Sequence, residues 1–431
     1  MDGEAAVPTG RIQRAARLTL IGADAAMGAM IGGDPSASAA RVARNLAELR
    51  GLAAKMGQLA GYVEGLLPAA QRGAYEQTLR SLQDAAMASP AAEIQLTIEK
   101  ELGAPIGELF DSWDPTPIAS ASLGQVHRAD LRGRPVALKV QHPGIARATD
   151  QDLSNGAMLE KLAAMFLGRN FGTRAMYDEL ATGFREELDY ELEGRRQMRI
   201  RRIHAADPAI RVPEVIEERT TRRVLCMELV GGATLEQARA AAPAEREAWC
   251  RTLWRFVFRG ILAEGVFNAD PHPGNYFFGP DGRVTFVDFG CTRQIAADKI
   301  GAIRAAHHAA QVRDEVAFEA TVAEMMQTRP GPLQQLSARF VRECFVPLFA
   351  SPFHVTSEYV EGLVTKAREF TEGMRALSAA EVTPSPPDLV FLNRLHFGFY
   401  SVLSRLDSEV DYAAIERALG APVDATANVA G

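Results

Sequence analysis

The stretch Val266–Gly290, VFNADPHPGNYFFGPDGRVTFVDFG, predicts a polar loop followed by a β-hairpin. Asp270 and Asn275 stand five residues apart in the loop, and a turn at Pro280–Gly282 then joins two short apolar runs. The second run ends at Asp288, the first residue of an Asp-Phe-Gly sequence. We therefore expect three oxygen-bearing side chains to converge at one end of the hairpin.

These three side chains have the chemistry of a phosphotransfer site. Mg²⁺ prefers oxygen ligands and completes its shell with water and nucleotide phosphates, so Asp288 and Asn275 suit it as ligands. Asp270 would then orient an attacking hydroxyl or water. Protein kinases use the same spacing between a catalytic Asp and an Asn, followed by Asp-Phe-Gly. The alternative is a Pro- and Gly-rich turn before an ordinary strand. The Asp270–Asn275 loop and the Asp-Phe-Gly sequence occur together at the separation found in kinases, and this disfavours the alternative.

The composition is that of a large globular protein. With 431 residues, 47% of them hydrophobic, the chain can form two lobes or domains with a sizeable core. The formal net charge of -7 argues against a broad nucleic-acid-binding face. The four cysteines lack the spacing of a zinc or redox site, so we predict thiols in a reducing compartment, the cytoplasm by default.

No apolar run reaches the roughly 18 residues expected of a membrane-spanning helix. The best candidate, Leu18–Ile31, contains Asp24 and several small residues, and it lacks the cleavage pattern of a secretory signal. We therefore expect no transmembrane segment, which leaves peripheral contact with a membrane open.

The N-terminal part is predicted to be helical after a flexible arm at residues 1–35, which is rich in Ala and Gly. From Ser36 the apolar residues recur at helical spacing, and a later helix is expected at Ala91–Leu102. Lys55 and Gln58, three residues apart, share one helix face. On local grounds alone, that face is a solvated stripe.

A small-residue loop and a hairpin are predicted after Pro117. The loop contains Ala119, Ser120, Ala121, Ser122 and Gly124. A turn at Arg132–Arg134 leads into a return strand that carries Lys139. Small side chains let backbone amides approach a phosphate closely, and Lys139 can supply a positive charge to it. Taken alone, such a loop is commonplace and such a lysine is usually an exposed strand residue.

The predicted helical stretch Asp152–Ile203 is acidic around Glu187, Asp189 and Glu193. If Lys139 binds phosphate, a Glu on a neighbouring helix is the usual partner that orients it. The local alternative is an acidic helix face exposed to solvent.

Two short runs, Ile210–Val215 and Arg223–Leu229, are predicted strands. We include Glu228, near the end of the second run, among the nucleotide-binding residues. The following pair, Gly231-Gly232, is predicted to be a hinge between lobes. The last third of the chain is predicted to be helical, in pieces broken at prolines.

With these pieces in one order, the chain resembles the UbiB-like atypical kinases, also called the ABC-one or AarF type, over roughly Leu49–Arg293. Lys55-Met-Gly-Gln58 fits that family's Lys-x-Gly-Gln motif, which lies on an N-terminal helical extension. The resemblance implies that Lys55 blocks the place of a peptide substrate. Glu187-x-Asp189 fits the family's Glu-x-Asp motif, which is expected to contact the Lys55 motif.

The resemblance also implies roles for the other residues. The small-residue loop corresponds to the family's Ala-rich loop, Lys139 to its nucleotide-binding lysine and Glu193 to the partner of that lysine. Asp270 corresponds to the catalytic or substrate-orienting Asp. Asn275 and Asp288 correspond to two Mg²⁺ ligands.

Three features depart from the family pattern. Ser120 replaces one Ala of the loop, which is expected to alter nucleotide preference or turnover. Asn268 stands where many relatives have His, and we expect it to change the packing beneath Asp288 without removing a ligand. The C-terminal membrane helices of some bacterial relatives are missing, which weakens the case for stable membrane anchoring.

The predicted fold is α+β: a bilobal protein-kinase-like fold with an N-terminal helical extension. We expect an arm at 1–35, the extension at 36–112, an N-lobe at 113–230 and a helical C-lobe at 231–431. The resemblance implies an ATP- and Mg²⁺-dependent atypical kinase or ATPase that acts on a small molecule or lipid and supports ubiquinone biosynthesis or lipid metabolism. A lipid or quinone precursor and a biosynthetic protein complex are the expected partners.

Two alternatives stay open. One is a non-catalytic, nucleotide-gated scaffold that binds lipid. The other is a small-molecule kinase of the aminoglycoside-phosphotransferase type, whose Asp-x-His-x-x-Asn loop matches Asp270–Asn275. The Asp-Phe-Gly sequence and the Lys55 motif argue against the second alternative.

Overall fold

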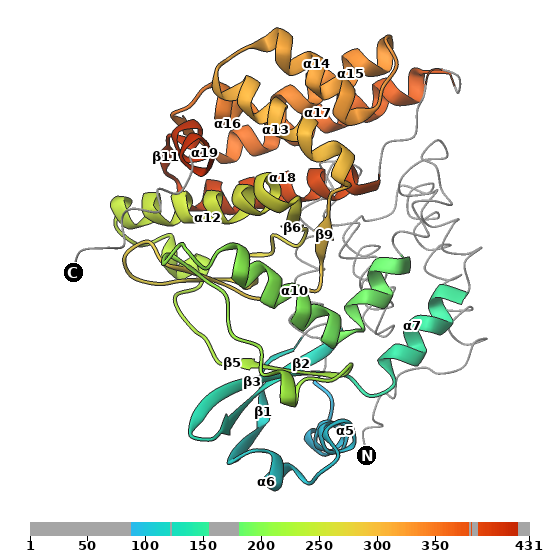
Figure 1. The fold of residues 1–431 in the computed structure, drawn as a ribbon, viewed down its shortest axis with the longest axis vertical. Helices are drawn as coiled ribbons and strands as arrows, with labels where there is room; N and C mark the ends of the chain where they lie inside the picture. The colour runs from blue at the N-terminus through green and yellow to red at the C-terminus, as the bar shows by residue number, and fades with distance from the viewer. Residues whose placement is uncertain (1–87, 121–122, 155–180, 379–380, 382–386, 421–431) are drawn as a thin grey trace, which may run out of the picture. The chain divides into compact units, whose positions relative to one another are not determined.

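The computed structural model describes residues 88–120, 123–154, 181–378, 381 and 387–420 (Figure 1). The chain forms two compact units made of interleaved segments. The first unit contains residues up to Met198, Pro213–Val230 and Phe289–Cys291. The second contains Arg199–Val212, Gly231–Asp288 and the residues from Thr292 onward. The predicted arm and most of the predicted extension lie outside the described residues, so the predicted domain boundaries stay a prediction.

The first unit is built on a four-stranded antiparallel sheet in the order β1-β2-β3-β5. Its strands are β1 Ser112–Ser120, β2 Gly124–Leu131, β3 Arg134–Gln141 and β5 Val224–Glu228. Arg132 and Gly133, at φ 52° and 71°, adopt the left-handed backbone that a two-residue hairpin turn requires. The sequence predicted the β2–β3 hairpin but not β1. Strand β1 contains two prolines and mostly exposed side chains, so it lacks the alternation of apolar and polar residues that indicates a strand.

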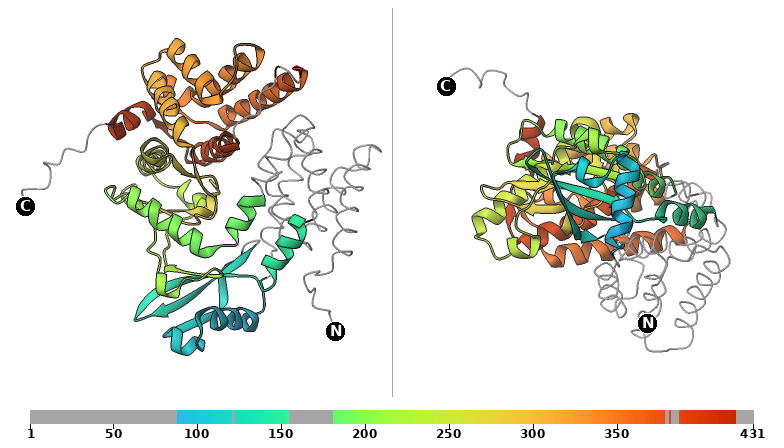
Figure 2. Two further views of the ribbon diagram at one scale, coloured as in Figure 1. Left: turned by 45° about the vertical axis from the view of Figure 1, so that its right-hand side comes forward. Right: turned by 90° about the horizontal axis from the view of Figure 1, so that it is seen from below.

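Successive side chains of β3 point to opposite faces of the sheet, and each face packs against a different helix. Leu138 and Val140 are fully buried in one cluster with Ile94 and Ile98 of α5, Ala91–Leu102, whose bounds match the predicted helix. This helix lies against the sheet in Figure 2. The intervening residue of β3, Lys139, faces the opposite way.

Helix α10, Tyr190–Ile203, contributes to a second hydrophobic cluster of the first unit. Its Tyr190 packs with Ala137 of β3 and with Leu225 and Met227 of β5. This unit also contains the shorter helices α6 Ile106–Leu109 and α7 Ile145–Ser154. The side of β3 that carries Lys139 is therefore the side that α10 approaches.

Helix α12, Pro243–Glu264, is the longest described helix of the second unit. Proline at its start suits the first turn, and Gly265 at φ 66° ends it in the left-handed conformation. Its Trp254 lies with ring centroids 4.3 Å from Phe258 and 4.1 Å from Tyr412. The aromatic residues of this helix are buried, as its sequence suggested.

The stretch that follows α12 forms the predicted loop and hairpin. The short strands are β4 Ile210–Arg211, β6 Val266–Asn268, β7 Tyr276–Phe278, β8 Val284–Phe286 and β9 Thr292–Gln294. Strands β7 and β8 are antiparallel, β4 pairs with β8 in parallel, and β6 pairs with β9. The turn between β7 and β8 places Asp281 at φ 58° and Gly282 at φ 70°. Strand β4 is shorter than the predicted Ile210–Val215 run, because the chain leaves β8 after two paired residues.

The remaining chain is mainly helical, as predicted. Its elements are α11 Leu235–Ala238, α13 Ala297–Gln311, α14 Glu315–Met326, α15 Pro332–Cys344, α16 Val346–Phe349, α17 Ser357–Ala376, α18 Pro387–Leu406 and α19 Tyr412–Gly420, with strands β10 Phe353–His354 and β11 Glu409–Val410. Within the described residues, no helix has both the length and the apolar character needed to cross a bilayer.

Candidate nucleotide site

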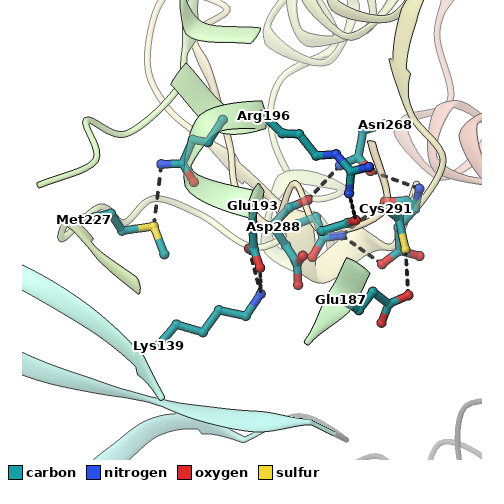
Figure 3. Close-up of polar contacts among 12 residues, drawn as sticks. Lys139, Glu187, Glu193, Arg196, Met227, Asn268, Asp288 and Cys291 are labelled. Carbon is teal, nitrogen blue, oxygen red and sulfur yellow. Dashed lines mark hydrogen bonds and ion pairs between the residues drawn. The ribbon is translucent and has the colours of Figure 1, made fainter. Parts of the chain in front are cut away.

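Lys139 and Glu193 form a buried ion pair in the first unit (Figure 3). Lys139 Nζ lies 2.8 Å from Glu193 Oε1 and 3.0 Å from Oε2. The two side chains are 15% and 2% exposed. The pairing that the sequence suggested is present, brought about by β3 and α10. Removing two charges from water costs a free energy similar to that gained from their attraction. Such a pair is therefore weak evidence for a role in stability.

Tyr190 is a neighbour of this pair that the sequence analysis missed. Lys139 Nζ lies 5.2 Å from the centroid of the Tyr190 ring, within the range of a cation–π contact. A side chain at Gly124 would place its Cβ 2.6 Å from the Tyr190 hydroxyl and against the Val140 carbonyl, so glycine is required there. Helical spacing could have predicted this neighbour, because Tyr190 precedes Glu193 by three residues and so lies on the same face of α10.

The small-residue loop is short and lies between β1 and β2. Ala119 and Ser120 end β1, where they pair with Val126 and Gln125, and Gly124 begins β2. Ala121 and Ser122 lie outside the described residues. The described ends of the loop are therefore held by the sheet.

Glu228 ends β5, where it pairs with Val136 of β3. Its backbone N–H donates to the Glu214 carbonyl at 2.9 Å. The chain passes from the first unit to the second between Val230 and Gly231, at the glycine pair predicted to be a hinge.

The Glu-x-Asp motif lies immediately before α10. Asp189 Oδ1 accepts the Leu192 N–H at 2.9 Å, which satisfies a free donor in the first turn of that helix. Glu187 Oε1 accepts a hydrogen bond from Cys291 Sγ at 3.1 Å (Figure 3). The predicted contact of these acids with Lys55 and Gln58 involves residues outside the described part of the chain, so it stays a prediction.

In the second unit the structure brings Asp270 and Asn275 together. Asn275 Nδ2 donates to the Asp270 carbonyl at 3.1 Å and to Asp270 Oδ2 at 3.3 Å. A single 3₁₀ turn, η3 Pro273–Asn275, closes this loop, and His272 Nδ1 accepts the Gly274 N–H at 3.1 Å at its start. The spacing of five residues seen in the sequence thus corresponds to a direct contact.

Asn268 connects this loop to Asp288. Asn268 Nδ2 donates to the Asp288 carbonyl at 2.8 Å, and Asn268 Oδ1 accepts the Asp270 N–H at 3.1 Å (Figure 3). Asp288 has φ 62°, a conformation that is uncommon outside glycine and costs free energy. Asn268 was expected to change the packing beneath Asp288. In the structure it makes two specific hydrogen bonds, one to the backbone of Asp288 and one to the backbone of Asp270. The sequence analysis placed Asn268 beneath Asp288 but did not predict these hydrogen bonds, one of which joins residues 20 positions apart.

The described core next to Asn268 is mostly apolar and contains a small cavity. A cavity of about 20 Å³, the size of one water molecule, is lined by Asn268, Tyr276 and Phe286. His204 also lines it and stacks on Phe256 with ring centroids 4.8 Å apart. Burial, reinforced by a nearby arginine, lowers the pKa of His204 to about 4. His204 is therefore neutral at physiological pH and belongs to the core.

Three comparisons relate the chain to known proteins. A family model described as the ABC1 atypical kinase-like domain matches residues 81–321, more than half of the chain. The chain is 36% identical to the uncharacterized protein sll1770 of Synechocystis over 60% of its own length and 44% of that protein. It is 37% identical to the Arabidopsis thaliana protein ACTIVITY OF BC1 COMPLEX KINASE 3, chloroplastic, over 50% of its length and 31% of that protein. It is 28% identical to the Rattus norvegicus atypical kinase COQ8B, mitochondrial, over 87% and 70%.

The chain thus spans less than half the length of the first curated relatives that it matches. Among solved structures, it is similar to Rv3197 of Mycobacterium tuberculosis, determined in complex with erythromycin. The TM-score is 0.61 at 25% identity, covering 84% of this chain and 90% of that one. The family match and this likeness together confirm the kinase-like fold predicted from the sequence.

Proposed function

Because the chain belongs to the ABC1 atypical kinase-like family, we propose that it binds ATP with Mg²⁺ and acts as an atypical kinase or ATPase. The observation that carries this proposal is the buried ion pair of Lys139 and Glu193. Such a pair is weak evidence for stability, whereas a lysine oriented by a glutamate is what kinases use to bind nucleotide phosphates.

The residues of the second unit fit a magnesium ion. Asn275 Nδ2 donates to Asp270, which leaves Asn275 Oδ1 as the acceptor atom for a cation. Asp288 adds a carboxylate, and oxygen donors of this kind are the ligands that Mg²⁺ prefers. When bound, Mg²⁺ supplies positive charge that neutralises the phosphates.

The remaining steps belong to residues of the chain. Lys139 Nζ, oriented by Glu193, contacts the phosphates, and backbone amides of the Ala119–Gly124 loop bind them. The Asp270 carboxylate orients the attacking water or acceptor hydroxyl, and Asn268 fixes the backbone that carries Asp270. Glu228, at the end of β5, is proposed to contact the nucleotide. Ser120 is proposed to influence nucleotide preference.

We assign the acceptor to small molecules or lipids in ubiquinone biosynthesis or lipid metabolism. Family membership supports this proposal, together with a proposed block of peptide access that involves Lys55, Gln58 and the Glu187-x-Asp189 motif. A lipid, a quinone precursor and a biosynthetic protein complex are the proposed partners. The negative net charge disfavours nucleic acid.

The likeness to Rv3197 favours a second candidate, binding of a bulky small molecule, because that protein was determined with erythromycin. Under this alternative, the chain would bind such a molecule without transferring phosphate to it. Direct binding of a macrolide, unaffected by ATP, would support this candidate.

For the compartment we propose the cytoplasm, with peripheral membrane contact, although two relatives are named as a chloroplastic and a mitochondrial protein. The cysteines support a reducing compartment, because all four are buried and in the thiol state. Burial raises the pKa of Cys226, Cys250 and Cys344 to about 12, so these thiols stay protonated and inert.

The proposed function is tested by ATP hydrolysis with Mg²⁺, with and without anionic liposomes and a phenolic mimic of a quinone precursor. We expect turnover that lipid or phenol accelerates. Asp270→Asn is expected to lower turnover by about 100-fold or more, while ATP with Mg²⁺ still raises the Tm of the variant. Nucleotide binding without turnover under every condition would instead support the non-catalytic scaffold. Phosphorylation of added peptides would contradict the proposed block of peptide access.

Asn268→Leu is expected to lower turnover by about 10- to 100-fold, because it removes both hydrogen bonds that position Asp270 and Asp288 at nearly constant volume. Steady-state kinetics with ATP and Mg²⁺ measures this effect. Asn268→His, which retains a ring N–H donor for the Asp288 carbonyl, serves as the matched variant and is expected to keep more activity. Wild-type turnover in Asn268→Leu would show that these bonds have no role in positioning.

A further inference from the structure

Arg196 connects two segments of the first unit that are distant in sequence. It lies on α10, and its Nη2 is 2.7 Å from Glu186 Oε2. Its Nη1 donates to the Gly290 carbonyl at 3.1 Å (Figure 3). One guanidinium group therefore contacts a carboxylate next to α10 and the glycine of the Asp-Phe-Gly sequence.

The segment that Arg196 contacts is buried and has a second attachment. Phe289 is fully buried and Cys291 is 6% exposed. Cys291 Sγ donates to Glu187 Oε1 at 3.1 Å, beside the residue that pairs with Arg196. Phe289–Cys291 thus belongs to the first unit, although the residues on either side of it, Asp288 and Thr292, belong to the second.

Arg196 follows Glu193 by three residues, so both side chains project from one face of α10. This face holds Lys139 through Glu193 and the Gly290 carbonyl through Arg196. A rotation of α10 would therefore displace both contacting side chains together. Gly290 follows Asp288 by two residues, and planar peptide bonds limit how far the backbone of Asp288 can move from it.

Resting on the proposed function, we propose that Arg196 is a positioning residue for the reaction. It makes the orientation of the Lys139–Glu193 pair depend on the placement of the Asp-Phe-Gly segment. Arginine suits this role because its planar fork presents several N–H donors to two partners at once, whereas a lysine presents one small ammonium group. The sequence gives no sign of this role, because Arg196 stands in a run of basic residues typical of an exposed helix.

The alternative is that Arg196 and Glu186 form a partly exposed ion pair with a small effect on stability. Arg199 provides a matched control, because it lies one turn further along α10 and contacts Glu264 and Gln294 instead of Gly290. A purely structural role predicts that kcat is unchanged in both Arg196→Gln and Arg199→Gln.

The test combines hydrogen–deuterium exchange of a peptide covering residues 286–292 with steady-state ATP hydrolysis. In the full chain, Arg196→Gln is expected to speed exchange in this peptide and to lower kcat by about 10-fold or more. Arg199→Gln is expected to change neither quantity. Arg196→Lys, which keeps the charge but not the fork, is expected to fall between wild type and Arg196→Gln. Thermal unfolding of each variant checks that it is folded.

Exchange separates this proposal from the proposed function, since it is measured whether or not the protein hydrolyses ATP. Equal exchange in Arg196→Gln and Arg199→Gln would overturn the proposal. Faster exchange in Arg196→Gln with unchanged kcat would also overturn it, because the segment would be held without effect on the reaction. If the wild type shows no turnover while Arg196→Gln still exchanges faster, the proposed enzyme is refuted. Arg196 then holds the Phe289–Cys291 segment in place without a role in a reaction.

Discussion

Asp288→Asn is expected to abolish the Mg²⁺-dependent part of ATP binding and to lower turnover by at least about 100-fold. The substitution removes the negative charge that makes Asp288 a ligand for Mg²⁺. It keeps the size of the side chain, and asparagine tolerates the φ of 62° found at this position. The fold should therefore survive. Thermal shifts with ATP and Mg²⁺, compared with ATP and a chelator, measure binding, and phosphate release measures turnover.

Asp281→Asn is a closely matched control for this substitution. Asp281 is an exposed aspartate at φ 58° in the turn of the same hairpin, so the chemical change and the backbone conformation are the same. We expect this variant to bind and hydrolyse ATP as the wild type does. Mg²⁺-dependent binding that persists in Asp288→Asn would show that Asp288 is not a metal ligand.

Glu193→Gln is expected to weaken ATP binding by about 10-fold or more and to lower the free energy of unfolding by about 3 kcal/mol. It removes the carboxylate charge that lies against the ammonium group of Lys139, whose side chain is 15% exposed. Lys139 then loses the opposite charge and the fixed direction that Glu193 gives it. Denaturant unfolding and nucleotide titration measure the two effects separately. Glu247→Gln, which breaks an exposed pair with Arg251, should change stability by less than about 1 kcal/mol.

The double variant Lys139→Met with Glu193→Leu separates stability from function. Replacing both charges by apolar groups removes the cost of burying them, so the free energy of unfolding should return to within about 1 kcal/mol of the wild type. ATP binding should remain lost. A double variant that binds ATP normally would refute the role of this pair in nucleotide binding.

Local patterns carried much of the prediction. The turn residues Pro280–Gly282 predicted the hairpin because glycine and aspartate tolerate the left-handed backbone that the turn requires. The predicted bounds of α5 match the structure, in which Gly103 ends the helix at φ 78° just beyond its last residue. The contact between Asp270 and Asn275 followed from their short separation. Strand β1 escaped prediction because its pairing with β2, rather than its own pattern, holds it in the sheet.

The sequence by itself determined which residue types stand at the candidate site: Lys139, Glu193, Asp270, Asn275 and Asp288. Residue types and their separations along the chain can be taken directly from the sequence, without a structure. Only the tertiary structure decided which neighbours hold them. Those neighbours are Tyr190 beside Lys139, Asn268 between Asp270 and Asp288, and Arg196 on the Gly290 carbonyl. Such contacts depend on which faces of distant elements pack together, and that is set by burial of the whole core rather than by any local pattern.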